Sequence, residues 1–210
     1  MIRRTRALFL TVASALSVGV VAAPAAQANL LSILPGSCGN QIESQPFAPW
    51  GDYSSYTPVL GGSFEHGGAG WLLSGGAAVS KGNESFHVGA ASDSHSLALP
   101  AGSSATSPPS CTNIYHPTVR LFVRNTGSSG SRLRVEALYP GLLGGVNTAT
   151  VGSVSGSSSW APSPAMTLLV SNLLSTLSLD QTAIAFRFTP ADKTGQWSID
   201  DVYLDPFGRR

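Results

Sequence analysis

Apolar and polar side chains alternate with a period of two residues in three stretches of the chain, 118–125, 131–139 and 182–189. This period is that of a β-strand with one face buried and the other exposed. We therefore predict three strands whose apolar faces meet in one core. The residues expected in that core are Val119, Leu121 and Val123; Leu133, Val135, Ala137 and Tyr139; and Ile184, Phe186 and Phe188.

Weaker strand patterns occur over 70–79, 94–99 and 147–154, and segments rich in Gly, Ser, Pro and Asn separate them. The segment NTGSSGS, 125–131, has the composition of a hairpin turn between the first two strong strands. One segment, Ala165–Leu177, carries apolar residues at a helical spacing. Many strands without alternating helices predict an all-β fold, an antiparallel β-sandwich and most simply a jelly roll, with one short helix at most.

The N-terminus has the three parts of a secretory signal peptide. Three arginines precede an apolar run over 7–23, and the small-x-small motif AQA ends at Ala28. A transmembrane helix is the weaker alternative, because the run is short and is followed by Pro24 and the cleavage motif. We predict that residues 1–28 are removed and that the protein is secreted to the extracellular space.

We expect the mature chain to divide into an irregular lead-in, 29–60, and a β-sandwich domain, 61–208. The chain has two cysteines, Cys38 in the lead-in and Cys111 in the sandwich. In an exported protein an even number of cysteines indicates disulfides, and two cysteines allow one pairing. The alternatives are a reactive thiol or a metal-binding pair, but there is no Cys-x-x-Cys motif or Cys–His cluster. We therefore predict a disulfide that ties the lead-in to the sandwich.

Charge is sparse, since 11% of the residues are charged. Removal of the signal peptide takes away three of the 12 Lys and Arg residues and none of the 11 acids, so the mature protein is slightly negative. Such a chain does not attract nucleic acid. No segment after the signal is apolar enough for membrane insertion. An uncharged partner suits this surface best.

Motifs for catalysis are missing from the sequence. It contains no Gly-x-Ser-x-Gly, no His-Glu-x-x-His, no phosphate-binding Gly-Lys-Ser/Thr loop and no EF-hand loop. An extracellular glycosidase needs two carboxylates across a cleft, and nothing singles out such a pair among the 11 acids. We predict a non-catalytic protein, and an exported hydrolase ranks behind the two hypotheses given below.

Two motifs resemble a known family. PVLGGSFEHGGAGWLLSGGAAV, 58–79, is similar to the opening of secreted carbohydrate-binding modules of the CBM4/9 type, which belong to the galactose-binding-like jelly rolls. WSIDDVYL, 197–204, resembles the last strand of the same group. The mature chain as a whole also resembles a family of small exported actinobacterial proteins. The resemblance implies a jelly-roll fold and leaves the ligand open, since this fold serves many binding tasks.

The closing motif places two adjacent carboxylates, Asp200 and Asp201, in a strand that otherwise has a buried pattern, where ionised groups need a partner. In the family that the chain resembles, a Glu of the opening motif and an Asp of the closing motif hold a structural calcium ion. The resemblance thus implies Glu65, Asp200 and Asp201 as calcium ligands, and Ca²⁺ prefers such oxygen ligands. In the alternative without an ion, Asp200 faces solvent and Asp201 accepts backbone N–H bonds or pairs with an arginine.

Sugar-binding sites use exposed aromatic rings that stack on a pyranose. Trp71 and Trp197 occupy the two motifs and are expected in the core. The remaining candidates lie in loop-like segments, although packing against the sandwich is the ordinary role of each. These candidates are Trp50, Tyr53, Tyr56, Tyr115 and Trp160.

The outward face of the first two strong strands is a second surface of interest. A basic and aromatic patch there would suit an acidic sugar, whereas the simpler interpretation is a solvated sheet face with cross-strand packing. The residues of this face are Arg120, Phe122, Arg124, Arg132 and Arg134.

Taken together, these patterns predict a secreted, non-catalytic module that binds a neutral polysaccharide or a cell-envelope glycan. The alternative is a structural or adhesive envelope protein whose partner is another protein.

Overall fold

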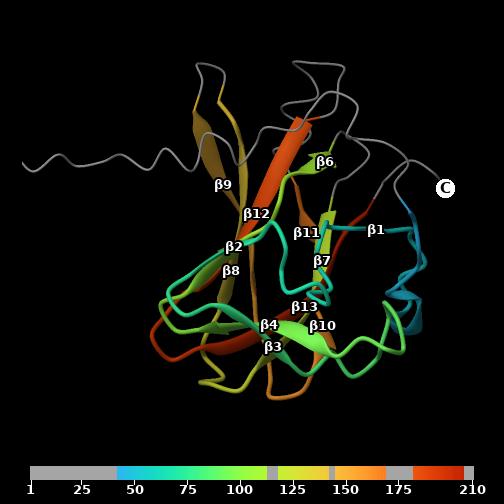
Figure 1. Cartoon of the computed structure of the whole chain (residues 1–210), viewed down its shortest axis with the longest axis horizontal. Helices are drawn as coiled ribbons and strands as arrows, with labels where there is room; N and C mark the ends of the chain where they lie inside the picture. The colour runs from blue at the N-terminus through green and yellow to red at the C-terminus, as the bar shows by residue number, and fades with distance from the viewer. Residues whose placement is uncertain (1–41, 113–117, 142–144, 169–181, 206–210) are drawn as a thin grey trace, which may run out of the picture.

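The three strands predicted from the two-residue period are present as β7 (Thr118–Asn125), β8 (Leu133–Pro140) and β12 (Thr182–Pro190). In the computed structural model, two antiparallel sheets pack face to face into the predicted β-sandwich of jelly-roll type (Figure 1). The residues that the structure describes are 42–112, 118–141, 145–168 and 182–205.

Each sheet combines strands from distant parts of the chain. The first sheet contains β7, β1 (Thr57–Pro58), β3 (Ala78–Lys81), β4 (His95–Pro100), β10 (Ala161–Pro162), β11 (Met166–Thr167) and β13 (Gln196–Asp205). Its order is β10-β7-β13-β4-β3, with β1 also paired to β13 and β11 to β7. The second sheet contains β8, β12, β2 (Leu72–Ser74), β5 (Ser104–Thr106), β6 (Ser110–Thr112) and β9 (Val146–Val154). Its order is β2-β5-β12-β8-β9, with β6 also paired to β12.

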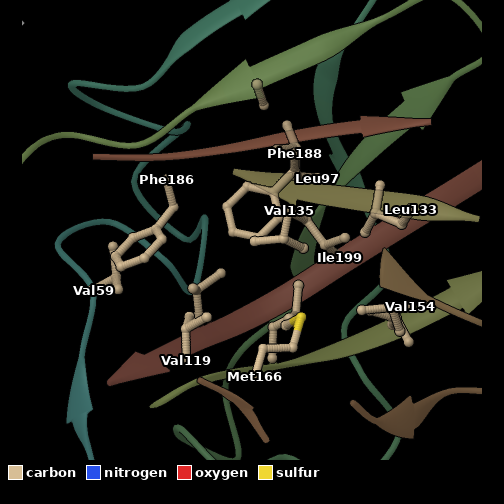
Figure 2. Close-up of a cluster of buried hydrophobic side chains, with 14 of the residues drawn as sticks. Val59, Leu97, Val119, Leu133, Val135, Val154, Met166, Phe186, Phe188 and Ile199 are labelled. Atoms are coloured by element: carbon tan, nitrogen blue, oxygen red, sulfur yellow. The ribbon is translucent and has the colours of Figure 1, made fainter. Parts of the chain in front are cut away.

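The main core lies between the two sheets and is lined by the apolar faces that the sequence predicts (Figure 2). Val119 from the first sheet and Val135, Phe186 and Phe188 from the second are fully buried. Nine of the ten predicted core residues are buried, and Tyr139 packs at the margin. Trp71 and Trp197 are also buried, as expected. Burial of this apolar surface is the main source of stability.

The segment 125–131 is not a hairpin turn, because β7 and β8 lie in different sheets. The backbone of this segment bonds instead to the chain that leads into β13: Thr126 donates to Gln196 at 2.9 Å and Ser128 donates to Thr194 at 3.0 Å. The chain therefore crosses from one layer of the sandwich to the other at this point. The composition of the turn did not reveal the crossing, since both kinds of connection use Gly and Ser.

The weak pattern over 70–79 forms two strands, β2 and β3, which lie in different sheets. Gly75 and Gly76 between them have φ of 62° and 90°. A Cβ at Gly75 would lie 2.3 Å from a backbone carbonyl oxygen of the neighbouring turn, so only glycine fits there. The strands predicted at 94–99 and 147–154 are confirmed as β4 and β9.

The beginning of the helix predicted at Ala165–Leu177 is a strand. Met166 and Thr167 form β11, which pairs with Val119 and Thr118 of β7. The Met166 side chain joins the main core, and a short apolar run cannot be assigned to helix or strand from its spacing alone. The rest of the predicted helix, from residue 169 on, lies outside the described residues.

The described part of the lead-in covers the outer face of the first sheet. Phe47 and Tyr56 pack with Phe122 of β7 and Tyr203 of β13 in a second, smaller cluster. A short 3-10 helix, η2 (Ala48–Trp50), lies next to this cluster in the chain. The outer face of β7 is thus largely buried, which its alternating pattern did not predict.

Several predictions fall on residues outside the described ranges. Cys111 is buried in β6, but Cys38 is not described, so the disulfide stays a prediction. The same holds for the signal peptide over 1–28 and for the domain boundaries at 29–60 and 61–208. Within the described ranges, no helix has the length and hydrophobicity needed to cross a membrane.

Candidate functional site

Strand β13 contains a β-bulge at the two adjacent carboxylates. Asp200 lies opposite Phe122 and Tyr203 lies opposite Arg120, so β13 has one residue more than β7 between these pairs. Asp201 has a φ of 45°, and such a local change of conformation accommodates the extra residue. As a result Asp200 and Asp201 are both buried, with 0% and 4% of their surface exposed. The alternative in which Asp200 faces solvent is therefore wrong.

Asp200 and Glu84 hold the backbone of the loop between β3 and β4. Asp200 accepts hydrogen bonds from the N–H groups of Glu84 and Asp201, each at 2.9 Å. Glu84 is fully buried, and its carboxylate accepts the N–H groups of Phe86 and Val88. These donors offset part of the cost of burying the two carboxylates.

Asp201 differs because one of its oxygens, Oδ2, is buried without a hydrogen-bond partner. A Cβ at Gly89 would lie 2.6 Å from Asp93 Oδ2 and 3.3 Å from Asp201 Oδ1, so the loop backbone lies directly against both carboxylates. Glu65 and Glu84 are close enough to act on Asp201 electrostatically. We call the following five residues the acidic pocket: Glu65, Glu84, Asp93, Asp200 and Asp201.

Glu65 is anchored at the start of β4. Its Oε1 accepts the N–H groups of Ser94 at 2.7 Å and of His95 at 2.6 Å, and its Oε2 lies 3.1 Å from Nδ1 of His95. Burial would raise the pKa of Glu65, but the hydrogen bonds from His95 and Ser94 outweigh burial and lower this pKa below its ordinary value. Glu65 therefore keeps its negative charge at neutral pH.

The two carboxyl groups deeper in the acidic pocket favour their protonated form. Burial, followed by the charge of Asp201, raises the pKa of Asp200 well above its ordinary value. Burial, followed by the charges of Glu84, Asp93 and Glu65, also raises the pKa of Asp201. In the part of the chain that the structure describes, no Lys or Arg forms an ion pair with any of the five carboxylates.

Asp201 is the residue of the acidic pocket whose chemistry best matches that of a cation ligand. This residue offers a buried oxygen without a partner, and a cation would relieve the repulsion among its neighbours. Among the described residues, no three Asp, Glu, His or Cys side chains converge as a ready set of metal ligands. Asp200 and Glu84 direct their oxygens to backbone N–H groups instead. Backbone carbonyl groups and water, which Ca²⁺ accepts as ligands, would complete the coordination.

The sequence missed two members of the acidic pocket. The resemblance implied Glu65, Asp200 and Asp201, whereas Glu84 and Asp93 come from the segment GNESFHVGAASD, 82–93. The only signal in that segment is a pair of acids near the two ends of a loop rich in small residues. Their place against β13 depends on tertiary contacts that no spacing in the sequence encodes.

Two half-exposed aromatic rings lie against Phe122 on the outer face of β7. Trp50 of η2 and Phe86 of the β3–β4 loop are 38% and 44% exposed. Their rings meet edge to face, with centroids 4.7 Å apart and an interplanar angle of 83°. Both contact the buried ring of Phe122, at centroid distances of 5.4 and 5.8 Å. We call Trp50, Phe86 and Phe122 the aromatic platform.

The other predicted sugar-binding residues have different environments. Tyr53 is 71% exposed. Tyr56 is 1% exposed and packs edge to face on the ring of Phe47, so the expectation of an exposed ring is wrong for Tyr56. Trp160 is partly buried and lies beneath the guanidinium of Arg124, 5.0 Å from the ring centroid. Tyr115 lies outside the described residues.

The basic face predicted over two successive strands does not exist as one surface. Because β7 and β8 lie in different sheets, Arg120 and Arg124 do not share a face with Arg132 and Arg134. Arg120 is 9% exposed and forms an ion pair with Asp52 at 2.5 Å. Its guanidinium also lies over an aromatic ring of the lead-in, 4.0 Å from the centroid. The lead-in thus covers the part of this face that belongs to β7.

No protein-family model matches the chain, and no curated protein sequence matches it. Similar solved structures include the CBM22-1 xylan-binding domain of Paenibacillus barcinonensis Xyn10C, with 14% identity, a TM-score of 0.46, and 70% of this chain and 92% of that chain covered. The CBM22-1–GH10 modules of Clostridium thermocellum endo-1,4-beta-D-xylanase 10B, complexed with xylohexaose, share 13% identity at a TM-score of 0.49. That match covers 70% of this chain and 28% of the xylanase chain.

TmCBM61 in complex with beta-1,4-galactotriose shares 17% identity at a TM-score of 0.41, with 70% of this chain and 97% of that chain covered. At such low values the likeness assigns neither a family nor a ligand. The resemblance to the CBM4/9 type and to the actinobacterial family stays a prediction. The three solved structures contain carbohydrate-binding modules, and the chain is similar to them in fold.

Proposed function

We propose that the protein is a secreted, non-catalytic module that binds a neutral polysaccharide or a cell-envelope glycan through the aromatic platform. The observation that carries this proposal is the pair of half-exposed rings, Trp50 and Phe86, held on the buried ring of Phe122. Apolar groups that are exposed next to one another often mark a binding site.

The geometry of the platform suits the apolar face of a sugar ring. An edge-to-face pair presents two ring surfaces in different planes, and the fixed ring of Phe122 below them limits their movement. Rigid aromatic rings lose little conformational entropy on binding, so most of their contact area contributes to affinity. Trp50 and Phe86 are therefore the residues expected to contribute most.

Polar groups next to the platform are available for sugar hydroxyls. Ser85 and His87 flank Phe86 and are exposed, and the exposed Tyr53 follows Trp50 in the lead-in. Their hydroxyl and imidazole groups can donate and accept hydrogen bonds. No ring of the platform carries a charge, which is consistent with an uncharged ligand.

The test is retention on insoluble polysaccharides, followed by a glycan array with the mature protein. Trp50→Ala and Phe86→Ala should each weaken binding by about 1 to 3 kcal/mol, because each removes a stacking ring. Leu72→Ala, at a half-exposed position on the second sheet, serves as a matched control. Trp160→Ala tests whether the platform extends to the ring beneath Arg124. Equal retention of the parent and both platform variants would overturn the proposal.

We also propose that the acidic pocket holds one structural calcium ion. When bound, the ion would supply positive charge to a buried group of carboxylates. The residues of this chain would act by holding it: Asp201 through its unpartnered oxygen, with Asp93 and Glu65 beside it. The resemblance to CBM4/9-type modules points to the same ion.

A second candidate function is that of a structural or adhesive envelope protein. The observation in its favour is a set of exposed leucines, with Leu60, Leu72 and Leu73 at 69%, 49% and 36% exposure. Exposed apolar groups of this kind also occur at protein interfaces. If the glycan tests fail, Leu72→Asp should then reduce binding to the envelope fraction, whereas Trp50→Ala should not.

A further inference from the structure

The loop between β3 and β4 contributes to both the acidic pocket and the aromatic platform. Glu84 and Asp93 belong to the pocket, and Phe86 belongs to the platform. The pocket fixes the loop backbone at Phe86 itself, because Phe86 donates its N–H to the carboxylate of Glu84. The N–H of Glu84 is bonded in turn to Asp200. The position of the Phe86 ring therefore depends on the conformation that the pocket imposes.

The two sites also share one face of the first sheet. Asp200 of β13 is the register partner of Phe122 of β7. Partner residues of antiparallel strands project from the same face of a sheet, so the Asp200 carboxylate and the Phe122 ring project side by side. The buried ring of the platform is therefore a direct neighbour of the pocket.

We propose that a calcium ion at the acidic pocket fixes the β3–β4 loop and thereby holds Phe86 against Trp50, so that calcium and the glycan bind cooperatively. The effect on the loop is independent of any glycan. The cooperative part rests on the proposed function.

Electrostatics explains why the loop needs the ion. In the described part of the chain, the five carboxylates of the pocket have no Lys or Arg partner. Two of them, Glu84 and Asp93, belong to the loop and approach Asp200 and Asp201 only where the loop lies against β13, so repulsion between the loop and the strand favours an open loop. A divalent cation between the loop and β13 replaces this repulsion by attraction to the carboxylates of both elements. The hydrogen bonds of Glu84, Phe86 and Val88 oppose this opening, and the half-exposed contacts of Phe86 add little to them. Calcium therefore shifts the balance toward the closed loop.

Thermodynamic linkage makes this cooperativity reciprocal. If calcium raises the affinity for the glycan by a certain factor, the glycan must raise the affinity for calcium by the same factor. We expect about a fivefold effect or more, which is the lower end of typical coupling between sites. Phe86→Ala should abolish the coupling and leave calcium binding intact, because alanine keeps the N–H group that bonds to Glu84.

The first experiment needs no glycan. Calcium is added to chelator-treated protein, and hydrogen exchange of the Phe86 and Val88 N–H groups is measured together with the fluorescence of Trp50. The emission of Trp50 is obtained by subtracting the fluorescence of the Trp50→Phe variant from that of the parent. We expect calcium to slow this exchange at least tenfold and to change the emission of Trp50. Asp201→Asn should remove both responses.

The variants are chosen to keep the fold. Asparagine tolerates the positive φ of Asp201, so Asp201→Asn removes charge without backbone strain. Asp192→Asn, in the turn before β13, makes the same change away from the pocket and should respond to calcium as the parent does. If Asp201→Asn fails to fold, the calcium response of the parent still tests the proposal. The same protein is then compared in calcium and in EGTA, so no variant is needed.

The outcomes separate the two proposals. Unchanged exchange and unchanged Trp50 emission at calcium up to about 10 mM, beyond the range of weak extracellular sites, would overturn the calcium coupling. Equal glycan affinity in calcium and in EGTA would overturn the cooperative part and leave the glycan function intact. A calcium response of Trp50 without retention on any glycan would support the loop mechanism and overturn the proposed function.

Discussion

Asp52, in the lead-in that covers β7, and Asp201, in β13, have opposite electrostatic settings. Asp52 accepts hydrogen bonds from Arg120 at 2.5 Å and from the Tyr56 hydroxyl at 2.6 Å. Burial would raise the pKa of Asp52, but hydrogen bonds from Tyr56, Ser54 and Arg120 outweigh burial and lower it. Asp201 has a buried oxygen without a partner and a raised pKa.

This difference separates a structural ion pair from a candidate ligand site. The lead-in supplies Asp52 and the sheet supplies Arg120, so the two elements neutralise one another and stay together. The acidic pocket brings five carboxylates together with no Lys or Arg partner in the described ranges. An internal partner makes a carboxylate part of the architecture, whereas a buried cluster without one in the described ranges is the basis on which we propose a cation from outside.

The largest expected effect concerns the covalent anchor of the lead-in, which carries Asp52. A Cys38–Cys111 disulfide closing a loop of roughly 70 residues should stabilise the protein by about 4 kcal/mol at most. Cys38→Ser should therefore lower the free energy of unfolding in urea by up to that amount. Mass spectrometry of the unreduced protein checks the bond, and two free thiols in that sample would rule it out.

The second effect tests the neutralised side of the comparison. Arg120→Ala leaves Asp52 and Tyr56 without their cation and removes the contact of the guanidinium with the Phe47 ring. Loss of one partner of a largely buried pair should destabilise the protein by about 3 kcal/mol, measured by urea unfolding. Arg134→Ala, which breaks a more exposed pair with Glu136, should cost less than about 1 kcal/mol. Equal costs would remove the special role of the Asp52–Arg120 pair.

The smallest effect is a pH dependence with opposite sign in the two regions. In EGTA, folded Asp201 holds a proton that the unfolded chain has lost, so its contribution to stability falls as pH rises from 5 to 8. The contribution of Asp52 is present above the ordinary carboxyl pKa and is lost as pH falls below about 4. The free energy of unfolding of the parent minus that of Asp201→Asn should fall by about 2 to 3 kcal/mol from pH 5 to pH 8, since each pH unit over which folded Asp201 keeps its extra proton costs about 1.4 kcal/mol. A constant difference would show that Asp201 has an ordinary pKa.

Periodicity in the sequence was sufficient to predict the sandwich. The strands over 118–125 and 182–189 have one apolar face each, and a period of two determines which residues enter the core. By contrast, β5 and β6 consist largely of Ser, Thr and Ala and lack such a period. They pair with β12 because of their position in the fold, which a local pattern cannot reveal.

The candidate site was only partly predictable. Asp200 and Asp201 were conspicuous because adjacent carboxylates are unusual in a buried strand, and Trp50 was conspicuous as an aromatic residue in a loop. Phe86 and Glu84 gave no such signal, since a loop residue gains its role from the surface against which it folds. The lead-in over β7 was also unpredictable, because two of the three outward residues of that strand are arginines, as on a solvated face, and Phe122 alone gave no sign of what covers it.

The most direct test of the account measures the melting temperature and the free energy of unfolding of the parent and Asp201→Asn, each in calcium and in EGTA. At calcium about 100 times its Kd, the parent should gain about 2.7 kcal/mol. Asp201→Asn should gain nothing, yet in EGTA it should be more stable than the parent, because the variant has lost the repulsion from Glu84 and Asp93. A parent that does not respond to calcium, or an Asp201→Asn variant that is less stable than the parent in EGTA, would contradict the claim that the pocket requires a cation from outside.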